Sequence, residues 1–179
     1  MNEQSNVRVN WVRGAIDQYE APLIRYAQRI TGDLETARDA VQDTFLKLCA
    51  ADREQVDAYL GPWLYRVCRN RALDLIKKEH RMHPLDTGHA EAQPSPAPDP
   101  YGVAVHREEE EAVIAAIDRL PEPQQEIFRL KFLDQLTYQE ISSVTGNSVS
   151  QVRYLIHISL KAVRTHLQTL NTTPGTAEA

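Results

Sequence analysis

The chain has 179 residues, a formal net charge of −5 and 42% apolar residues, which is enough for one ordinary domain or two small ones. Aromatic residues make up only 7% and glycine is scarce, a balance that favours helices over strands. No apolar stretch approaches the roughly 18 residues that span a bilayer, and residues 1–10 lack the apolar core of a signal peptide. We therefore expect a cytoplasmic protein without membrane insertion.

Three helical patterns occupy the first part of the chain and predict a helical domain over residues 11–83. The first pattern ends at Gly32 and places on one face Ile16, Leu23, Ala27 and Ile30. The second begins at Asp33, a predicted N-cap, and its apolar stripe is Leu34, Ala37, Val41, Phe45 and Leu48. The third has Pro62 in its first turn and is expected to bury Leu64, Cys68, Ala72 and Leu75 or Ile76. Both cysteines, Cys49 and Cys68, are expected to be small buried hydrophobes rather than disulfide or metal ligands.

Residues 84–106 are rich in proline and alanine and show no helical periodicity, so they predict a flexible, extended linker. A second helical domain is expected over residues 107–170. It contains two adjacent helix-start signals, the capping box Thr137–Glu140, with Leu136 stapling onto Ile141, and the similar box Ser148–Gln151. Gly146 supplies the turn between them, which predicts a helix-turn-helix. The expected fold is all-α, with two small helical domains and a helix-turn-helix at the end of the second.

Two predicted helices carry basic faces suited to nucleic acid. On the third helix, steps of three and four residues align Arg66, Asn70, Asp74, Lys77 and Arg81, a pattern that favours phosphate contact with an amide available for a base. A solvated helix is the alternative. Trp63 precedes this face and is expected in the core, whereas Tyr65 is open between core packing and stacking on an unpaired base.

The last predicted helix has a buried stripe of Val149, Val152, Ile156, Leu160 and Val163. Its opposite face carries Ser150, Tyr154, His157 and Lys161, with Arg153 and Arg164 at the margin. No acidic residue occurs between Ile141 and Ala177. This surface is typical of a recognition helix in a major groove.

The second predicted helix has an acidic face opposite its apolar stripe, made of Glu35, Asp39, Gln42 and Asp43. Like charges at this spacing disfavour an isolated helix. The face is either a solvated surface or a docking surface for a basic partner helix.

Enzyme functions find no support in the motifs. The sequence has no phosphate-binding glycine loop, dinucleotide fingerprint or H-E-x-x-H. A group formed by His80, His83, Asp86 and His89 straddles a helix end and a proline, so scattered histidines are a better interpretation than a zinc site. We predict a non-enzymatic protein with no catalytic residues, cofactor or metal.

Several runs resemble bacterial sigma factors. The second sigma domain is matched by Tyr26–Asp33, Ala40–Leu48, Trp63–Val67 and Asn70–Asp74, and the fourth by Leu120–Glu122, Leu136–Ile141 and Val149–Val152. With only these two domains and a short linker, the chain is similar to the extracytoplasmic-function (ECF) branch.

The resemblance implies three contact sets. Residues implied to bind the clamp helices of core RNA polymerase are Asp39, Gln42, Asp43 and Phe45. Those implied to open and read the minus-ten element, with the loop before them, are Tyr65, Arg66, Arg69, Asn70, Arg71, Lys77 and Lys78. The minus-thirty-five element is implied to meet Ser148, Ser150, Gln151, Arg153, Tyr154, His157, Lys161 and Arg164. Leu155 and Ile158 stand where the family commonly carries arginines.

We therefore expect a sigma factor that directs core RNA polymerase to specific promoters and initiates transcription. Its DNA partners would be double-stranded promoter DNA and the melted minus-ten strand, and an anti-sigma factor is left open as a further partner. The alternative is a stand-alone helix-turn-helix regulator with a helical dimerisation domain. The proline-rich tether and the acidic face count against that alternative, because a repressor dimer needs a fixed half-site spacing.

Overall fold

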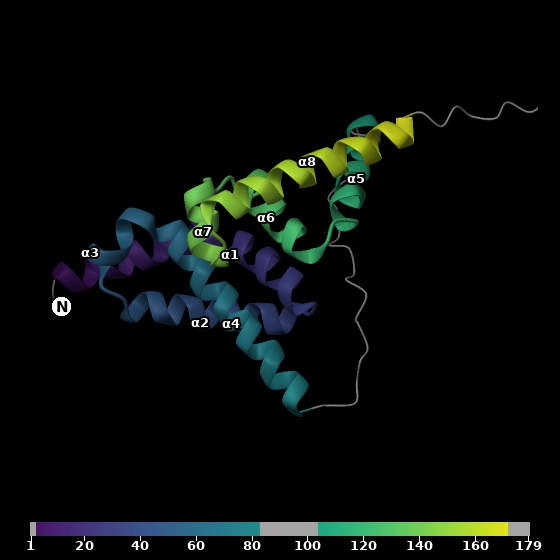
Figure 1. Cartoon of the computed structure of the whole chain (residues 1–179). Helices are drawn as coiled ribbons and strands as arrows, with labels where there is room; N and C mark the ends of the chain where they lie inside the picture. The colour runs from purple at the N-terminus through teal and green to yellow at the C-terminus, as the bar shows by residue number, and fades with distance from the viewer. Residues whose placement is uncertain (1–2, 83–103, 172–179) are drawn as a thin grey trace, which may run out of the picture. The chain divides into compact units, whose positions relative to one another are not determined.

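The computed structural model describes residues 3–82 and 104–171, and its regular elements there are all helices (Figure 1). The chain divides into two compact units, with the division between Pro94 and Ser95. This arrangement confirms the predicted all-α class, while most of the predicted linker falls on residues 83–103, outside the described ranges. Within the described ranges, no helix combines the length and apolar character needed to cross a membrane.

The first unit contains α1 (Glu3–Thr31), α2 (Leu34–Ala50), α3 (Arg53–Val56), the 3₁₀ helix η1 (Asp57–Tyr59) and α4 (Leu60–Met82). The long helices α1, α2 and α4 pack on one another in all three pairs. Their common core includes the fully buried side chains Leu23, Ala27, Ala37, Leu48, Leu64, Cys68 and Ala72. These are the positions that the helical periodicity predicts, since an amphipathic helix turns one stripe inward.

Backbone chemistry at the α1–α2 junction confirms the predicted stop and start. Gly32 adopts the left-handed conformation, with φ of +75°, and its N–H donates to the Gln28 carbonyl at 2.8 Å. The Asp33 carboxylate accepts the Thr36 N–H at 2.7 Å, as an N-cap does. The hydrogen bond from Thr36 holds the pKa of Asp33 below its usual value.

Three features of the first unit differ from expectation. Helix α1 begins at Glu3, well before residue 11, because its early turns contact the segment that follows α2. That segment contains α3 and η1, which apolar periodicity did not predict because both helices are too short to show it. Cys49 is exposed, contrary to expectation, whereas Cys68 is buried and burial raises the pKa of its thiol to about 12.

The second unit contains α5 (Ala104–Asp118), α6 (Glu122–Phe132), α7 (Tyr138–Thr145) and α8 (Val149–Asn171). Helices α5, α6 and α7 each pack on α8. Thr137 and Glu140 form the predicted capping box. Gly146 has φ of +78°. The Ser148 N–H donates to Gln151 Oε1 at 2.8 Å, and the Gln151 N–H donates to Ser148 Oγ at 3.2 Å. Helices α7 and α8 therefore form the predicted helix-turn-helix.

One position of the predicted α8 stripe is wrong. Leu160 is 38% exposed, whereas the neighbouring Ser159 is fully buried. The Ser159 hydroxyl donates to the Leu155 carbonyl at 2.7 Å, which satisfies the buried polar group inside its own helix. The stripe continues through Val152, Ser159 and Val163, because a serine bonded in this way can occupy an inward position.

Candidate nucleic-acid interface

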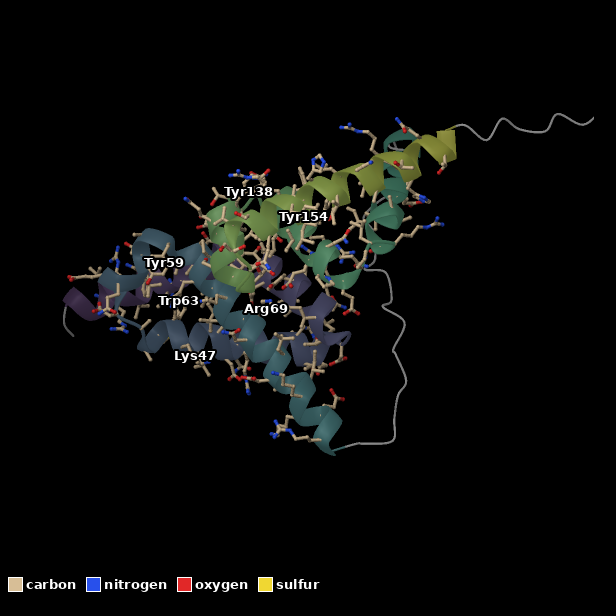
Figure 2. The ribbon with its side chains drawn as sticks, viewed as in Figure 1. Lys47, Tyr59, Trp63, Arg69, Tyr138 and Tyr154 are labelled. Atoms are coloured by element: carbon tan, nitrogen blue, oxygen red, sulfur yellow. The ribbon has the colours of Figure 1, made fainter. Side chains whose placement is uncertain are left out.

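The predicted basic face of α4 is exposed along its length. Arg66, Asn70 and Lys77 are solvent-accessible, as are Asp74, Lys78 and Arg81. Leu64, Cys68 and Ala72 on the opposite side are fully buried, so core packing fixes which way the basic face points. Arg69, labelled in Figure 2, is only partly exposed and has contacts of its own. The arrangement presents several cations and one amide on a single helical surface, which suits a nucleic-acid backbone and a base edge.

The aromatic side chains around the start of α4 divide into buried and exposed groups. Tyr65 is 3% exposed, and its ring packs edge-on against Tyr26 with centroids 5.1 Å apart. The expectation that it belongs to the minus-ten surface is therefore corrected, because the ring would have to leave the core to stack on a base. Trp63 is partly exposed, and Tyr59 in η1 is 48% exposed; both are labelled in Figure 2.

Tyr59 is a candidate that sequence reasoning missed. It is an exposed aromatic on the segment directly before the basic helix, the position at which an unpaired base could stack. Asp52, the N-cap of α3, accepts the Glu54 N–H at 3.1 Å, and an aspartate of this kind is the signal that could have indicated a helix in this segment. The sequence alone offered no periodicity to show that Tyr59 points outward.

Two residues predicted for different partners contact each other. The Arg71 guanidinium on α4 forms an ion pair with the Asp43 carboxylate on α2, and their side chains are 35% and 36% exposed. Arg71 therefore faces α2 rather than the exposed surface of α4. This ion pair counts against Arg71 as a minus-ten contact and against Asp43 as a polymerase contact, because each charge already has a partner of opposite sign.

The outward surface of α2 is less acidic than its sequence indicates. Asp39 and Gln42 are exposed as predicted, but Glu35 pairs with Arg38 at 2.6 Å. Phe45 is 8% exposed, which confirms its place on the predicted apolar stripe, and its implied contact with polymerase stays a prediction.

A groove between α1 and α2 is lined by apolar side chains and rimmed by Glu20, Arg38 and Gln42. Leu46, which the sequence pattern left out of every set, lies on it and is 60% exposed. The α2 surface therefore combines an exposed apolar residue with polar groups of both signs, a composition suited to a protein partner.

The predicted reading face of α8 is exposed. Tyr154 is 63% exposed (Figure 2), and the neighbouring exposed side chains are Ser150, Arg153, His157, Lys161 and Arg164. Ser148 and Gln151 have a structural task in addition, because their hydrogen bonds hold the first turn of α8. Leu155 and Ile158 are partly buried, so these two positions turn toward the unit rather than to solvent.

The part of the chain that the structure describes contains no candidate metal site. There, no group of three or more histidine, cysteine or acidic side chains could hold an ion. His83, Asp86 and His89 lie outside the described residues.

Comparison with known proteins assigns both units to one family. The family model for sigma-70 region 2 matches residues 15–82, and the model for sigma-70 region 4 matches residues 110–163. The exposed basic face of α4 lies within the first match, and the helix-turn-helix, apart from the end of α8, lies within the second.

Individual relatives point the same way. The chain is 27% identical to the ECF RNA polymerase sigma factor RpoE of Cereibacter sphaeroides, over 74% of this chain and 71% of that protein. It is 24% identical to the sigma factor SigW of Bacillus subtilis, over 87% of this chain and 88% of that protein. Against SigE of Mycolicibacterium smegmatis the identity is 25%, over 85% of this chain, which spans 60% of that relative.

A solved structure shows the same fold. The sigma factor RpoE of Bartonella quintana, crystallised with the anti-sigma factor NepR, superposes with a TM-score of 0.64 at 19% identity, over 87% of this chain and 96% of that chain.

The matches to sigma-70 region 2 and sigma-70 region 4 define a transcription initiation factor of the sigma-70 class. The chain belongs to the ECF branch of that family.

Proposed function

We propose that this chain binds core RNA polymerase, brings it to specific promoters and helps to open the minus-ten element. The observation that carries the proposal is the pair of exposed basic helix faces, on α4 and α8, in two separate compact units. Two such faces in one chain suit two promoter elements, one in each unit. The protein has no catalytic role of its own and acts in the cytoplasm, where polymerase and promoters meet.

The minus-ten set is centred on Arg66, Asn70 and Lys77, with Lys78, Arg69 and the exposed ring of Tyr59. The cations hold phosphates, while Asn70 and Tyr59 offer an amide and a π-face to bases that leave the duplex. Opening the duplex costs a few kcal/mol per unstacked base, which contacts to the released strand offset. Tyr65 supports this surface from the core, and Arg71 supports it through its ion pair with Asp43, rather than by contact with DNA.

The minus-thirty-five set is the exposed face of α8. Tyr154 and His157 lie at its centre and are suited to base edges, whereas Lys161 and Arg164 lie further along and are pure donors suited to phosphates. Ser150 and Arg153 complete the face near the start of the helix. Ser148 and Gln151 fix the helix start and thereby the depth at which it enters the groove.

Polymerase contact is proposed for the outward surface of α2. Asp39, Gln42 and Leu46 are exposed together there, and an interface usually combines a central apolar anchor with a polar rim. The anti-sigma complex of the Bartonella quintana relative supports proteins of that class as further partners of this chain.

Reconstitution with purified core polymerase tests the proposal. Core enzyme plus this chain should select a two-part promoter motif from a random library and make the minus-ten thymines reactive to permanganate. Asp39→Lys with Leu46→Asp should abolish both by loss of core binding, while Glu54→Lys, an exposed change on α3, should leave core binding intact. The proposal fails if the wild-type chain does not enrich any motif in the presence of core enzyme.

A further inference from the structure

One side of α1 faces the segment between α2 and α4. The side chains Arg8, Trp11 and Tyr19, with the buried Ala15 between them, follow one another at steps of three and four residues. They therefore lie on a single stripe of the helix. Each of the three contacts a different part of the segment from Cys49 to Gly61.

Arg8 holds the end of α2. Its Nη2 donates to the Ala51 carbonyl at 2.8 Å and to the Cys49 carbonyl. Carbonyls in the last turn of a helix have no partner within the helix, so a guanidinium with several donors satisfies them from outside. The exit direction of the chain from α2 is thereby tied to α1.

Trp11 holds η1. Its indole Nε1 donates to Asp57 Oδ1 at 2.8 Å, and the Arg53 guanidinium lies 5.7 Å from the centroid of the same indole. Arg53 also pairs with Asp57, with 3.5 Å between Nε and Oδ2. The three side chains form a closed set of contacts that joins α1, α3 and η1, and Val56, the last residue of α3, is buried at 4% exposure.

Tyr19 approaches the start of α4. A Cβ added at Gly61 would lie 3.1 Å from the Tyr19 hydroxyl oxygen and 3.4 Å from its ring, so glycine permits the close approach of the two helices. Together the three contacts support the whole connection, from the last turn of α2 to the first turn of α4.

We infer that Arg8 and Trp11 are positioning residues for promoter opening: the α1 stripe holds α3 and η1 so that the exposed Tyr59 is presented to an unpaired base. The inference rests on the proposed function, because it assigns Tyr59 and the segment before α4 to the minus-ten element. A short segment has little core of its own, and a recognition site keeps its geometry only when surrounding contacts hold it. Here the two short helices receive those contacts from α1.

The experiment uses the full chain with core polymerase and compares Trp11→Phe, Arg8→Ala and the control Arg13→Ala, an exposed arginine on the same helix. Trp11→Phe keeps an aromatic ring and removes the indole donor. Both test variants should open a consensus promoter about threefold to tenfold less, as expected for the loss of one or two net hydrogen bonds. They should also broaden the minus-ten motif selected from a library. Core affinity, minus-thirty-five preference and helicity should match the control, and Arg8→Lys should recover part of the opening because lysine still donates.

Three outcomes would overturn the inference. Variants that open promoters and select the same minus-ten motif as Arg13→Ala would show that the stripe does not position the segment. A loss of core affinity and upstream binding in parallel with opening would show a general effect on stability instead. If the wild-type chain itself opened no promoter, the proposed function would fail as well, and this result distinguishes the two failures.

Discussion

The ion pair between Asp43 and Arg71 can be measured by a double-mutant cycle of Asp43→Ala, Arg71→Ala and the double variant. The two side chains join α2 to α4 and are each about one third exposed. Exposed pairs contribute about 0.2–1 kcal/mol, and a charge-assisted hydrogen bond in a partly shielded position belongs at the upper end of that range. We therefore expect a coupling free energy of about 1 kcal/mol at low salt, with a smaller value at about 1 M salt because exposed charges are screened.

Urea unfolding followed by tryptophan fluorescence is the appropriate assay. Trp11 and Trp63 are the only tryptophans in the chain and both lie in the first unit, so the signal reports on that unit even if the second unfolds separately. A coupling energy indistinguishable from zero would refute the ion pair as a stabilising contact. Asp43 would then be as free as Asp39 to contact polymerase, and its original place in the polymerase set would return.

Other predictions concern helix ends and the recognition face. Asp33→Ala should destabilise the first unit by about 1 kcal/mol at neutral pH. Because the pKa of Asp33 is lowered from 3.8 in the folded state, its contribution is present above that value and is lost as pH falls through the folded pKa; an equal loss in urea unfolding at low and neutral pH would contradict the cap. Gly146→Ala should lower the stability of the second unit by about 1 kcal/mol, because alanine is strained at a φ of +78°. No atom lies within 4 Å of the added Cβ, so a steric clash does not add to this backbone strain. An unchanged thermal midpoint would contradict the strain. Tyr154→Ala or His157→Ala should relax one or two minus-thirty-five positions by about 1–3 kcal/mol, whereas Lys161→Ala should weaken all sequences alike and reduce the salt slope by about one. A library selection with unchanged motifs for Tyr154→Ala would remove this face from base reading.

Local signals predicted the fold well where the chemistry is local. Gly32, Asp33, Gly146 and the Thr137–Glu140 box act within a few residues of their own position, so their roles can be recognised from sequence alone. The basic faces of α4 and α8 were likewise predictable, because helical periodicity decides which side chains share a surface and the apolar stripe decides which surface is buried.

Contacts between elements were less predictable. Arg71 and Asp43 lie on different helices, so helical periodicity cannot relate them. Only the packing of α4 on α2 brings the two side chains together. Tyr65 was open between two roles because an aromatic near a helix start fits core and surface equally well. The contact of Trp11 with Asp57 spans 46 residues of sequence, and no spacing rule links such positions. Leu160 was assigned to the buried stripe in place of Ser159 because helical periodicity counts a serine as polar and takes no account of its hydrogen bond to the preceding turn.

Permanganate footprinting of promoter DNA with core polymerase alone, with the chain alone and with both together distinguishes a sigma factor from a stand-alone regulator. We predict reactive thymines at the minus-ten element only when both are present, on promoters that also carry an upstream element. Asn70→Ala should reduce this reactivity more than it reduces the upstream footprint. Protection of a two-fold symmetric site by a dimer of the chain alone, with no reactive thymines on adding polymerase, would contradict a role as a sigma factor, because that is the behaviour of a stand-alone helix-turn-helix regulator.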